Sequence, residues 1–271
     1  MIDPLRVVAE RGLVLLGCGK MGGAMLEGWL AAGLPPETVS IIDPAPAPAL
    51  AARGVVVNGA LPEAPAVLVL AVKPQMMEAA LPQVAGLAGP DTLALSIAAG
   101  LPLAWFAARL GEGTPIVRAM PNTPAAVGRG ITALIPNAAG ADRLPLAEAL
   151  CAAVGETVRL DGEEQMDAVT ALSGGGPAYV FHLIEAMAQA GEAAGLGPDL
   201  AMALARTTVC GAGELAWRSA ESAETLRVNV TSPGGTTAEA LKVLMDAERG
   251  LPPLMTRAVA AAAARSRALG G

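Results

Sequence analysis

The chain has 271 residues, of which 53% are hydrophobic and only 2% aromatic, and its net charge at pH 7 is −7. This length allows one large domain or two smaller ones. Because proteins that bind nucleic acids present basic surfaces, the acidic balance excludes nucleic acid as a partner. The three cysteines, Cys18, Cys151 and Cys210, are widely spaced, so they indicate neither a disulfide framework nor a metal site.

The high hydrophobic fraction raises the question of a membrane span. The longest runs without charge, 92–108 and 168–184, fall just short of the length that spans a bilayer, and glycine and proline interrupt both. We therefore expect no membrane insertion and a soluble protein of the cytoplasm.

A glycine-rich loop follows the first apolar run, Leu13–Leu16. Its sequence is Gly17-Cys18-Gly19-Lys20-Met21-Gly22, and a helical pattern continues over Gly23–Ala32. In such a loop the first glycine permits a tight turn, the second lets a pyrophosphate approach the backbone, and the third brings helix and strand together. A strand before the loop and a helix after it predict a dinucleotide-binding site.

An acidic residue, Asp43, ends the second predicted strand, Val39–Ile42. A carboxylate at this spacing accepts hydrogen bonds from ribose hydroxyls and repels a 2′-phosphate. A turn residue before Pro44 is an equally good interpretation, and both stay open. Prolines follow at alternate positions, so no basic residue stands directly after the strand to hold a 2′-phosphate.

Alternating strands and helices continue to about residue 161 and predict a Rossmann-type, doubly wound α/β sheet. The further strands are expected at Pro65–Val72, Thr92–Ile97, Ile116–Ala119, Ile131–Ile135 and Glu156–Leu160. Strand ends at this edge of such a sheet line the coenzyme crevice. The segments that follow three of these strands are Ala71-Val72-Lys73-Pro74, Ala98-Ala99-Gly100 and Met120-Pro121-Asn122-Thr123-Pro124. The last of them shapes a ligand site or merely turns the chain.

The second half, from about residue 162, reads as helices only, rich in alanine and leucine. Its weakly polar helices must be covered on most faces, and in about 110 residues the simplest cover is another subunit. We therefore predict a dinucleotide-binding domain over 1–161 and a helical, substrate-binding domain over 162–271 that forms a homodimer.

Two further glycine-rich turns precede helices in this half. Ser173-Gly174-Gly175-Gly176-Pro177 is either a turn pressed against a ligand or a linker. Ser232-Pro233-Gly234-Gly235-Thr236-Thr237 combines glycines with hydroxyl groups, which makes an anion-binding cup for a carboxylate. Plain capping of the next helix by Thr236 or Thr237 is the alternative.

The single histidine, His182, falls in an apolar helical pattern and is expected to be a packed residue. With His182 packed in a helix, no other histidine is left to serve a Ser/His/Asp triad, and no metal-ligand cluster is visible. The chemistry must therefore come mostly from a cofactor that the protein positions.

Taken together, these motifs resemble those of the pyrroline-5-carboxylate reductase family, the last enzyme of proline synthesis. The match rests on the first glycine loop, Ala71-Val72-Lys73-Pro74-Gln75, Met120–Pro124, Ser173–Tyr179 and Asn229–Thr237, in the family's order along nearly the whole chain. The resemblance implies NADPH- or NADH-dependent hydride transfer to the cyclic imine, giving L-proline. It also implies a homodimer through the helical domain, active sites between the domains, and in many members rings of dimers.

The resemblance also implies roles for individual residues. Substrate carboxylate would sit on Ser232, Gly235, Thr236 and Thr237, and Thr170 would be the catalytic residue near the ring nitrogen. The coenzyme would contact Gly17, Cys18, Gly19, Lys20, Met21, Gly22, Asn58, Ala71, Val72, Lys73, Pro74, Ala98, Ala99, Gly100, Glu163 and Asn229. The positions of Asp43 and Asn122 after predicted strands add these two residues to the expected coenzyme contacts.

Two departures from the family pattern affect these expectations. Members often have a serine where this chain has Gly175, so one polar contact is missing. Members that favour NADPH usually carry serine, threonine, asparagine or arginine after the second strand, where this chain has Asp43-Pro44. The choice of coenzyme therefore stays open.

Two rival functions fit parts of this sequence pattern. A β-hydroxyacid dehydrogenase or imine reductase shares the two-domain plan, but the former uses a lysine on the inter-domain helix, and no lysine lies between Lys73 and Lys242. A nucleotide-sensing protein without turnover would not need the intact substrate cup.

Overall fold

The computed structural model describes residues 5–270, so the outermost ends of the two predicted domains, 1–4 and 271, lie outside it. The described chain forms two compact units. The first comprises residues 5–174 together with 262–270, and the second comprises residues 175–261. The predicted boundary between residues 161 and 162 differs from this division into compact units. The assignment of coenzyme binding to 1–161 and of substrate binding to 162–271 stays a prediction.

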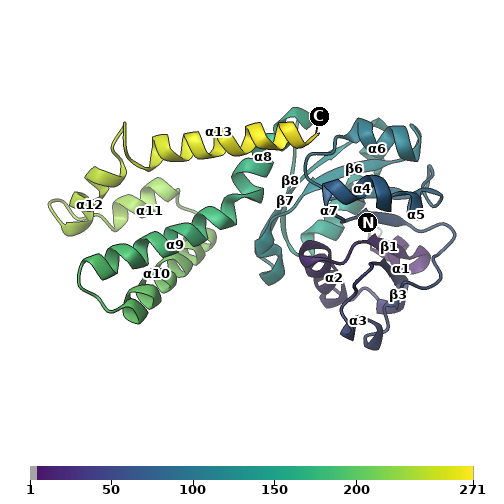
Figure 1. The fold of residues 1–271 in the computed structure, drawn as a ribbon, viewed down its shortest axis with the longest axis horizontal. Helices are drawn as coiled ribbons and strands as arrows, with labels where there is room; N and C mark the ends of the chain where they lie inside the picture. The colour runs from purple at the N-terminus through teal and green to yellow at the C-terminus, as the bar shows by residue number, and fades with distance from the viewer. Residues whose placement is uncertain (1–4, 271) are drawn as a thin grey trace. The chain divides into compact units, whose positions relative to one another are not determined.

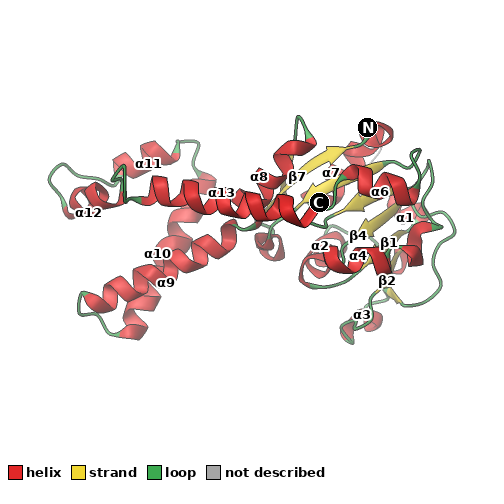
Figure 2. Cartoon of the chain, turned by 45° about the horizontal axis from the view of Figure 1, so that its top comes forward, coloured by secondary structure: helices red, strands yellow, loops and turns green. Residues whose placement is uncertain are grey.

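The first unit is built on one sheet, whose strands are yellow in Figure 2. The sheet has eight strands in the order β3-β2-β1-β4-β5-β6-β7-β8. The strands are β1 (Leu13–Leu16), β2 (Val39–Ile42), β3 (Val56–Val57), β4 (Val67–Leu70), β5 (Leu93–Ser96), β6 (Ile116–Met120), β7 (Gly130–Pro136) and β8 (Gly155–Arg159). The predicted bounds of the first two strands are confirmed. The very short β3 carries too little pattern to be recognised in the sequence.

The first six strands are parallel, as in a Rossmann fold, whereas β7 runs antiparallel to β6 and β8 is parallel to β7. A parallel return needs a crossover of a dozen or more residues. Only the short 3-10 helix Thr123–Val127 separates β6 from β7, so the chain turns back directly. The predicted α/β class is confirmed, with this antiparallel edge added.

Helices cover both faces of the sheet, and alternate residues of one strand supply the two cores. In β1, Leu13 and Leu15 belong to the core that includes Met25 and Trp29 of α2 (Lys20–Ala31). The other two residues of β1, Val14 and Leu16, belong to the opposite core, which contains Phe106. This two-residue period is that of a strand buried on both sides. Figure 1 shows helices on either side of the strands.

The remaining helices of the first unit are short. They are α1 (Arg6–Arg11), α3 (Ala49–Ala52), α4 (Pro74–Ala80), α5 (Pro82–Ala85), α6 (Leu103–Leu110), α7 (Leu144–Ala152) and α8 (Met166–Val169). The 3-10 helices are Pro36–Thr38, Thr123–Val127, Ala138–Arg143 and Glu163–Gln165, and a π-helical turn spans Thr170–Gly174.

The second unit is entirely helical, as predicted. It contains α9 (Gly176–Ala193), α10 (Pro198–Arg218), α11 (Ala223–Asn229), α12 (Thr236–Leu244) and the first part of α13 (Leu251–Gly270). The apolar residues it buries within the chain are small alanines: Ala188, Ala201 and Ala205. Large apolar side chains stay exposed instead, including Phe181, Leu200 and Trp217.

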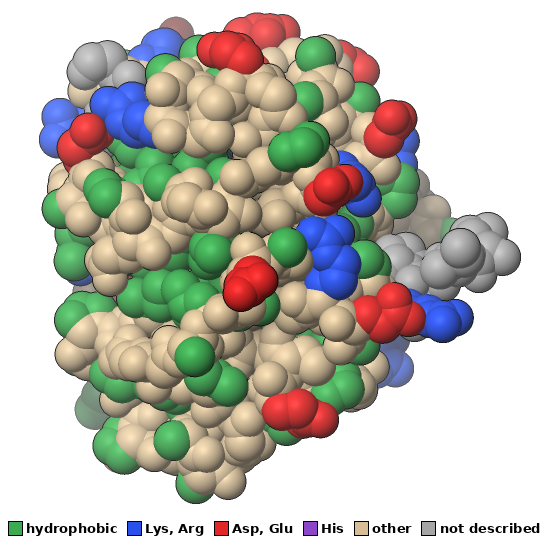
Figure 3. All heavy atoms as spheres, turned by 90° about the vertical axis from the view of Figure 1, so that its right-hand side faces the viewer, with side chains coloured by type: hydrophobic (Ala, Val, Ile, Leu, Met, Phe, Trp, Pro, Cys, Tyr) green, Lys and Arg blue, Asp and Glu red, His purple; other side chains and the backbone are tan. Residues whose placement is uncertain are grey.

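Surface charge is mixed on the face of the first unit that Figure 3 shows. Acidic and basic side chains on this face lie interspersed among apolar and uncharged polar ones, without a broad basic area. Among the described residues, no helix combines the length and hydropathy needed to cross a membrane.

Candidate active site

The glycine loop lies between β1 and α2, and two of its glycines are required by close packing. Gly17 has φ +91°, and a Cβ there would lie 2.8 Å from Val72 Cγ1. A Cβ at Gly22 would lie 2.4 Å from the Gly17 carbonyl oxygen. Both positions exclude a side chain, which agrees with the tight turn and the helix–strand contact predicted for them.

Gly19 differs, because a Cβ there would meet no atom within 4 Å. It is the N-cap residue of α2, and no side chain caps that helix. The N–H groups of an uncapped helix start, together with the helix dipole, favour an anion. The open space and the free helix start fit the pyrophosphate of a dinucleotide.

Asp43 holds the loop from the end of β2. Its Oδ2 accepts a hydrogen bond from the Cys18 N–H at 2.6 Å, and its Oδ1 accepts one from the Ala45 N–H at 2.8 Å. Burial raises the pKa of the Cys18 thiol, and the Asp43 and Glu27 charges raise it further. The carboxylate therefore combines the turn role with the position expected of a ribose acceptor.

Asn58 in turn fixes Asp43. Its side chain donates from Nδ2 to the Asp43 carbonyl at 2.8 Å and accepts from the Asp43 N–H at 3.0 Å. Asn58 is the one described non-glycine residue with positive φ, at +49°, a conformation that asparagine tolerates better than most residues. This pair closes one side of a cavity of about 520 Å³, which is lined by Leu16, Ile42, Asp43, Pro44, Asn58, Val72, Gln75, Met76, Ala79, Ala80 and Gln83.

The other predicted coenzyme contacts of the first unit follow neighbouring strands. Ala71 and Val72 come directly after β4, Lys73 is the N-cap of α4, and Pro74 is its first residue. The segment 98–100 follows β5 in the same way, and Gly100 has φ +82°. Because β1, β4 and β5 are adjacent and parallel, these segments share one sheet edge with the glycine loop.

Two motifs that are far apart in sequence meet beside this edge. Asn122 donates from Nδ2 to Ser173 Oγ at 3.3 Å, and its Oδ1 accepts from the Ile131 N–H. A Cβ at Gly174 would lie 2.5 Å from Met120 Cε. Thr170 opens the π-helical turn and donates its hydroxyl to the Met166 carbonyl at 2.8 Å. Single π-turns occur often at functional sites.

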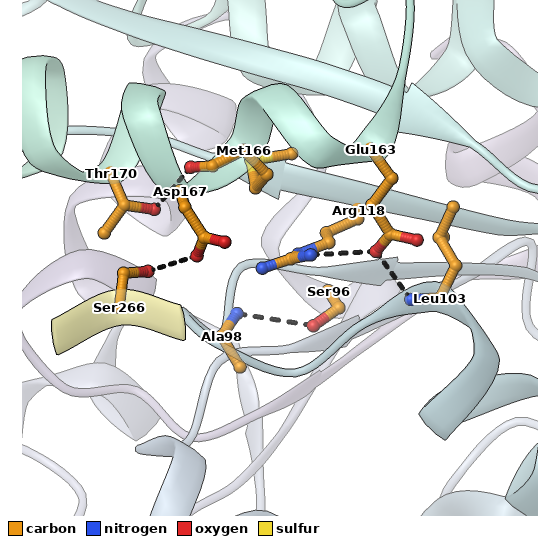
Figure 4. A network of polar contacts seen from close by, with 9 residues as sticks. All are labelled: Ser96, Ala98, Leu103, Arg118, Glu163, Met166, Asp167, Thr170 and Ser266. Carbon is orange, nitrogen blue, oxygen red and sulfur yellow. Dashed lines mark hydrogen bonds and ion pairs between the residues drawn. The ribbon is translucent and has the colours of Figure 1, made fainter. Parts of the chain in front are cut away.

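A polar network surrounds Glu163 (Figure 4). One oxygen of this carboxylate accepts from Arg118 Nη1 and from the Leu103 N–H at the start of α6, both at 2.8 Å. Arg118 is buried in β6. Nearby, Ser266 of α13 donates to Asp167 Oδ1 at 2.6 Å.

A second cavity of about 380 Å³ is lined by Arg118, Glu163, Asp167 and Ser266, together with Gly100, Pro102, Glu164 and Arg267. The sequence analysis did not single out Arg118, Asp167 or Ser266. A signal was available for Arg118, because a charge in the middle of an apolar strand is rarely buried without a partner.

The predicted carboxylate cup lies in the helical unit. Gly235 is the N-cap of α12, Thr236 is its first residue, and no side chain caps the helix. The capping alternative is therefore wrong: the threonine hydroxyls make no such bond. The Gly235 N–H donates to the Ser232 carbonyl at 3.0 Å, which closes the turn.

Two other predicted residues of this unit have local partners. Asn229 ends α11 and donates from Nδ2 to the Glu221 carboxylate, with the shorter distance 3.3 Å. His182 is not packed within the described chain: its side chain is 80% exposed, and Nδ1 lies 3.1 Å from Glu185 Oε2. The expectation of a packed histidine placed it on the apolar side of α9, whereas it lies on the polar side.

The strand order and the glycine loop after β1, with a cavity beside Asp43, define a Rossmann-type protein of the dinucleotide-binding class. A family model described as "NADP oxidoreductase coenzyme F420-dependent" matches residues 12–100, and one described as "Pyrroline-5-carboxylate reductase dimerisation" matches residues 163–269. The chain belongs to the pyrroline-5-carboxylate reductase family.

Relatives cover nearly the whole chain. The pyrroline-5-carboxylate reductase of Pseudomonas aeruginosa is 40% identical over 264 residues, which are 95% of this chain and 96% of that one. The structure of a Coxiella burnetii pyrroline-5-carboxylate reductase superposes with a TM-score of 0.88 at 33% identity, over 96% of this chain and 99% of that one. The structure of a Plasmodium falciparum pyrroline carboxylate reductase with NADP bound superposes with a TM-score of 0.83 at 28% identity, over 97% of this chain and 99% of that one.

Proposed function

We propose that the chain reduces the C=N bond of 1-pyrroline-5-carboxylate to L-proline, with NADPH or NADH as the hydride donor. As a member of its family it is an oxidoreductase that acts on an imine. The observation that carries the assignment is the pairing of two anion sites in one chain. One is the uncapped start of α2 beside Gly19, and the other is the uncapped start of α12.

The first unit would hold the coenzyme. The glycine loop and Lys20 would bind its pyrophosphate, and Asp43 and Asn58 its adenosine. The segments after β4 and β5, with Asn122 and Glu163, would border its nicotinamide ring. Supporting this, the carboxyl ends of β1, β4 and β5 lie side by side in the sheet, where ligands of such folds bind. When bound, the coenzyme supplies the hydride.

The second unit would hold the substrate. The N–H groups at the start of α12 and the hydroxyls of Ser232, Thr236 and Thr237 would grip its carboxylate. A protonated cyclic imine accepts hydride at carbon directly, so orientation is the main demand on the protein. Such positioning supplies roughly 7–11 kcal/mol of a barrier. Thr170 would lie near the ring nitrogen, and Asn229 near the coenzyme.

The hydroxyl of Thr237 gives the most direct test of the cup. Thr237→Ala removes one donor to the carboxylate, so we expect the KM for the imine to rise about tenfold, as for a lost hydrogen bond to a charge. The dissociation constant of the coenzyme should stay within twofold of the original value, roughly 0.4 kcal/mol. Absorbance at 340 nm and coenzyme titration measure these two quantities.

Thr256→Ala is the matched control, since the Thr256 hydroxyl donates to the Pro252 carbonyl within α13. It should leave the KM unchanged. An unaltered KM in Thr237→Ala would remove the cup assignment. Failure of the unmodified enzyme to oxidise either coenzyme with the imine would instead remove the proposed reaction and favour a sensing role.

Two observations support a homo-oligomer: the match of residues 163–269 to the family model described as a dimerisation domain, and the exposed apolar side chains on the helices of the second unit. We place the homodimer contact in this unit, with assembly of dimers into rings and a cytoplasmic location as further proposals. Against a β-hydroxyacid dehydrogenase stands the absence of lysine between Lys73 and Lys242.

A further inference from the structure

We infer that the adenosine end of the crevice selects NADH over NADPH, and that Asp43, positioned by Asn58, makes this selection. The inference rests on the proposed function only in taking the crevice of the first unit as a dinucleotide site. It is carried by the hydrogen-bond donors and charges that surround the end of β2.

A 2′-phosphate needs hydrogen-bond donors, and the chain offers none free at positions 43 to 46. The Asp43 N–H is bonded to Asn58 Oδ1, and the Ala45 N–H is bonded to Asp43 Oδ1. Pro44 and Pro46 have no N–H. The Cys18 N–H of the glycine loop is also taken, by Asp43 Oδ2.

Ribose hydroxyls need the opposite, because they can donate to a carboxylate. Each carboxylate oxygen has a second acceptor position after one hydrogen bond is made, so both Asp43 oxygens can still accept from the 2′- and 3′-hydroxyls. The three bonds that tie Asp43 to Cys18, Ala45 and Asn58 hold these acceptors in one place. The site is therefore built for an unphosphorylated ribose.

Charge acts in the same direction. Among the residues that line the 520 Å³ cavity, Asp43 is the one charged side chain, and no lysine or arginine is present. The next basic residue after β2, Arg53, forms an ion pair with Glu27. A 2′-phosphate, close to doubly ionised at pH 7, would lie beside an uncompensated carboxylate.

Equilibrium binding tests this selection without turnover. NADH and NADPH are titrated into the purified full chain by nicotinamide fluorescence, and AMP and adenosine 2′,5′-bisphosphate by calorimetry. For a like-charge contact in a solvent-lined crevice we expect NADH and AMP to bind about tenfold or more tightly than their 2′-phosphorylated counterparts.

Asp43→Asn removes the negative charge while keeping the shape of the side chain. If that variant does not fold, Asp43→Ser is the second variant that removes the charge. In either, the preference should fall to about threefold or less, roughly half of the original discrimination in free energy. Glu112→Gln makes the same change of net charge at an exposed position outside the cavity, and it should keep the original preference.

The outcomes separate the two proposals. Equal or tighter binding of NADPH by the unmodified chain, or an unchanged preference in both Asp43 variants, would overturn the inference. Imine reduction with NADPH as the better donor would overturn it while leaving the proposed function in place. Binding of neither coenzyme would overturn both.

Discussion

Single residues in this chain often combine a structural contact with a site position, and Glu163 shows this most clearly. Its carboxylate caps the start of α6 through the Leu103 N–H and pairs with Arg118, whose side chain is 6% exposed. A buried cation without its partner is costly, because the interior does not replace the lost hydration.

Glu163→Gln should therefore lower the free energy of unfolding by about 2–3 kcal/mol, less than for a fully buried pair because Glu163 is partly exposed. Urea denaturation measures the change. Glu164→Gln removes the same charge from the adjacent exposed residue and should change stability by less than about 0.5 kcal/mol. Equal effects of the two substitutions would show that the ion pair contributes little.

At the scale of elements, the start of α2 contains three glycines within five residues, Gly19, Gly22 and Gly23. Their substitution should affect stability and coenzyme binding differently. A Cβ at Gly22 would strike the Gly17 carbonyl, a Cβ at Gly23 would come no closer than 3.8 Å to another residue, and one at Gly19 would meet nothing. An added methyl group would thus clash at Gly22, make an ordinary van der Waals contact at Gly23, and enter open space at Gly19.

Gly22→Ala should destabilise the protein by about 2 kcal/mol or more, as overpacking does, and should abolish coenzyme binding. Gly23→Ala should be neutral or stabilising by up to about 1 kcal/mol, since alanine favours helix. Gly19→Ala should keep the melting temperature but lose coenzyme affinity. Thermal melts and NADH titrations check all three. An unchanged affinity of the Gly19→Ala variant for NADH would show that the pyrophosphate does not bind beside Gly19.

Elements with long apolar patterns could be predicted from sequence, and those set by distant contacts could not. Runs such as Leu13–Leu16 and Val39–Ile42 identify buried parallel strands because both faces are covered. The reversal at β7 depends on the shortness of the connection after Met120, and Gly174, which ends the π-helical turn, packs on the distant residue Met120. No local pattern encodes either.

The site was predictable to a similar extent. The glycine loop has a motif of its own, whereas the Arg118–Glu163 pair joins residues 45 positions apart. The sequence places an acid at Asp43, but only the folded chain shows that its oxygens are bonded to Cys18 and Ala45.

For the whole molecule, the exposed apolar surface of the helical unit is the dominant feature. Phe181 is 61% exposed and Leu200 54% exposed, and a soluble chain rarely leaves so many large apolar side chains uncovered. A second copy of this unit would cover them.

Light scattering at micromolar concentration should therefore give at least a dimer. Phe181→Glu should shift the population toward monomer, because a charge buried at an apolar interface costs several kcal/mol, on the order of 3. Val127→Glu changes an exposed apolar residue of the first unit, 76% exposed, and should leave the mass unchanged. A monomeric unmodified chain would contradict the dimer.

The bond between Ser266 and Asp167 has a consequence for biosynthesis. It joins residues 99 positions apart, and residues 262–270 complete the first compact unit although the helical unit is made before them. The helical unit is thus an insertion within a discontinuous domain. During synthesis the contact between Ser266 and Asp167 therefore forms only after the whole insertion has left the ribosome, whereas the two described hydrophobic cores, which contain no residue after Val154, can assemble before it.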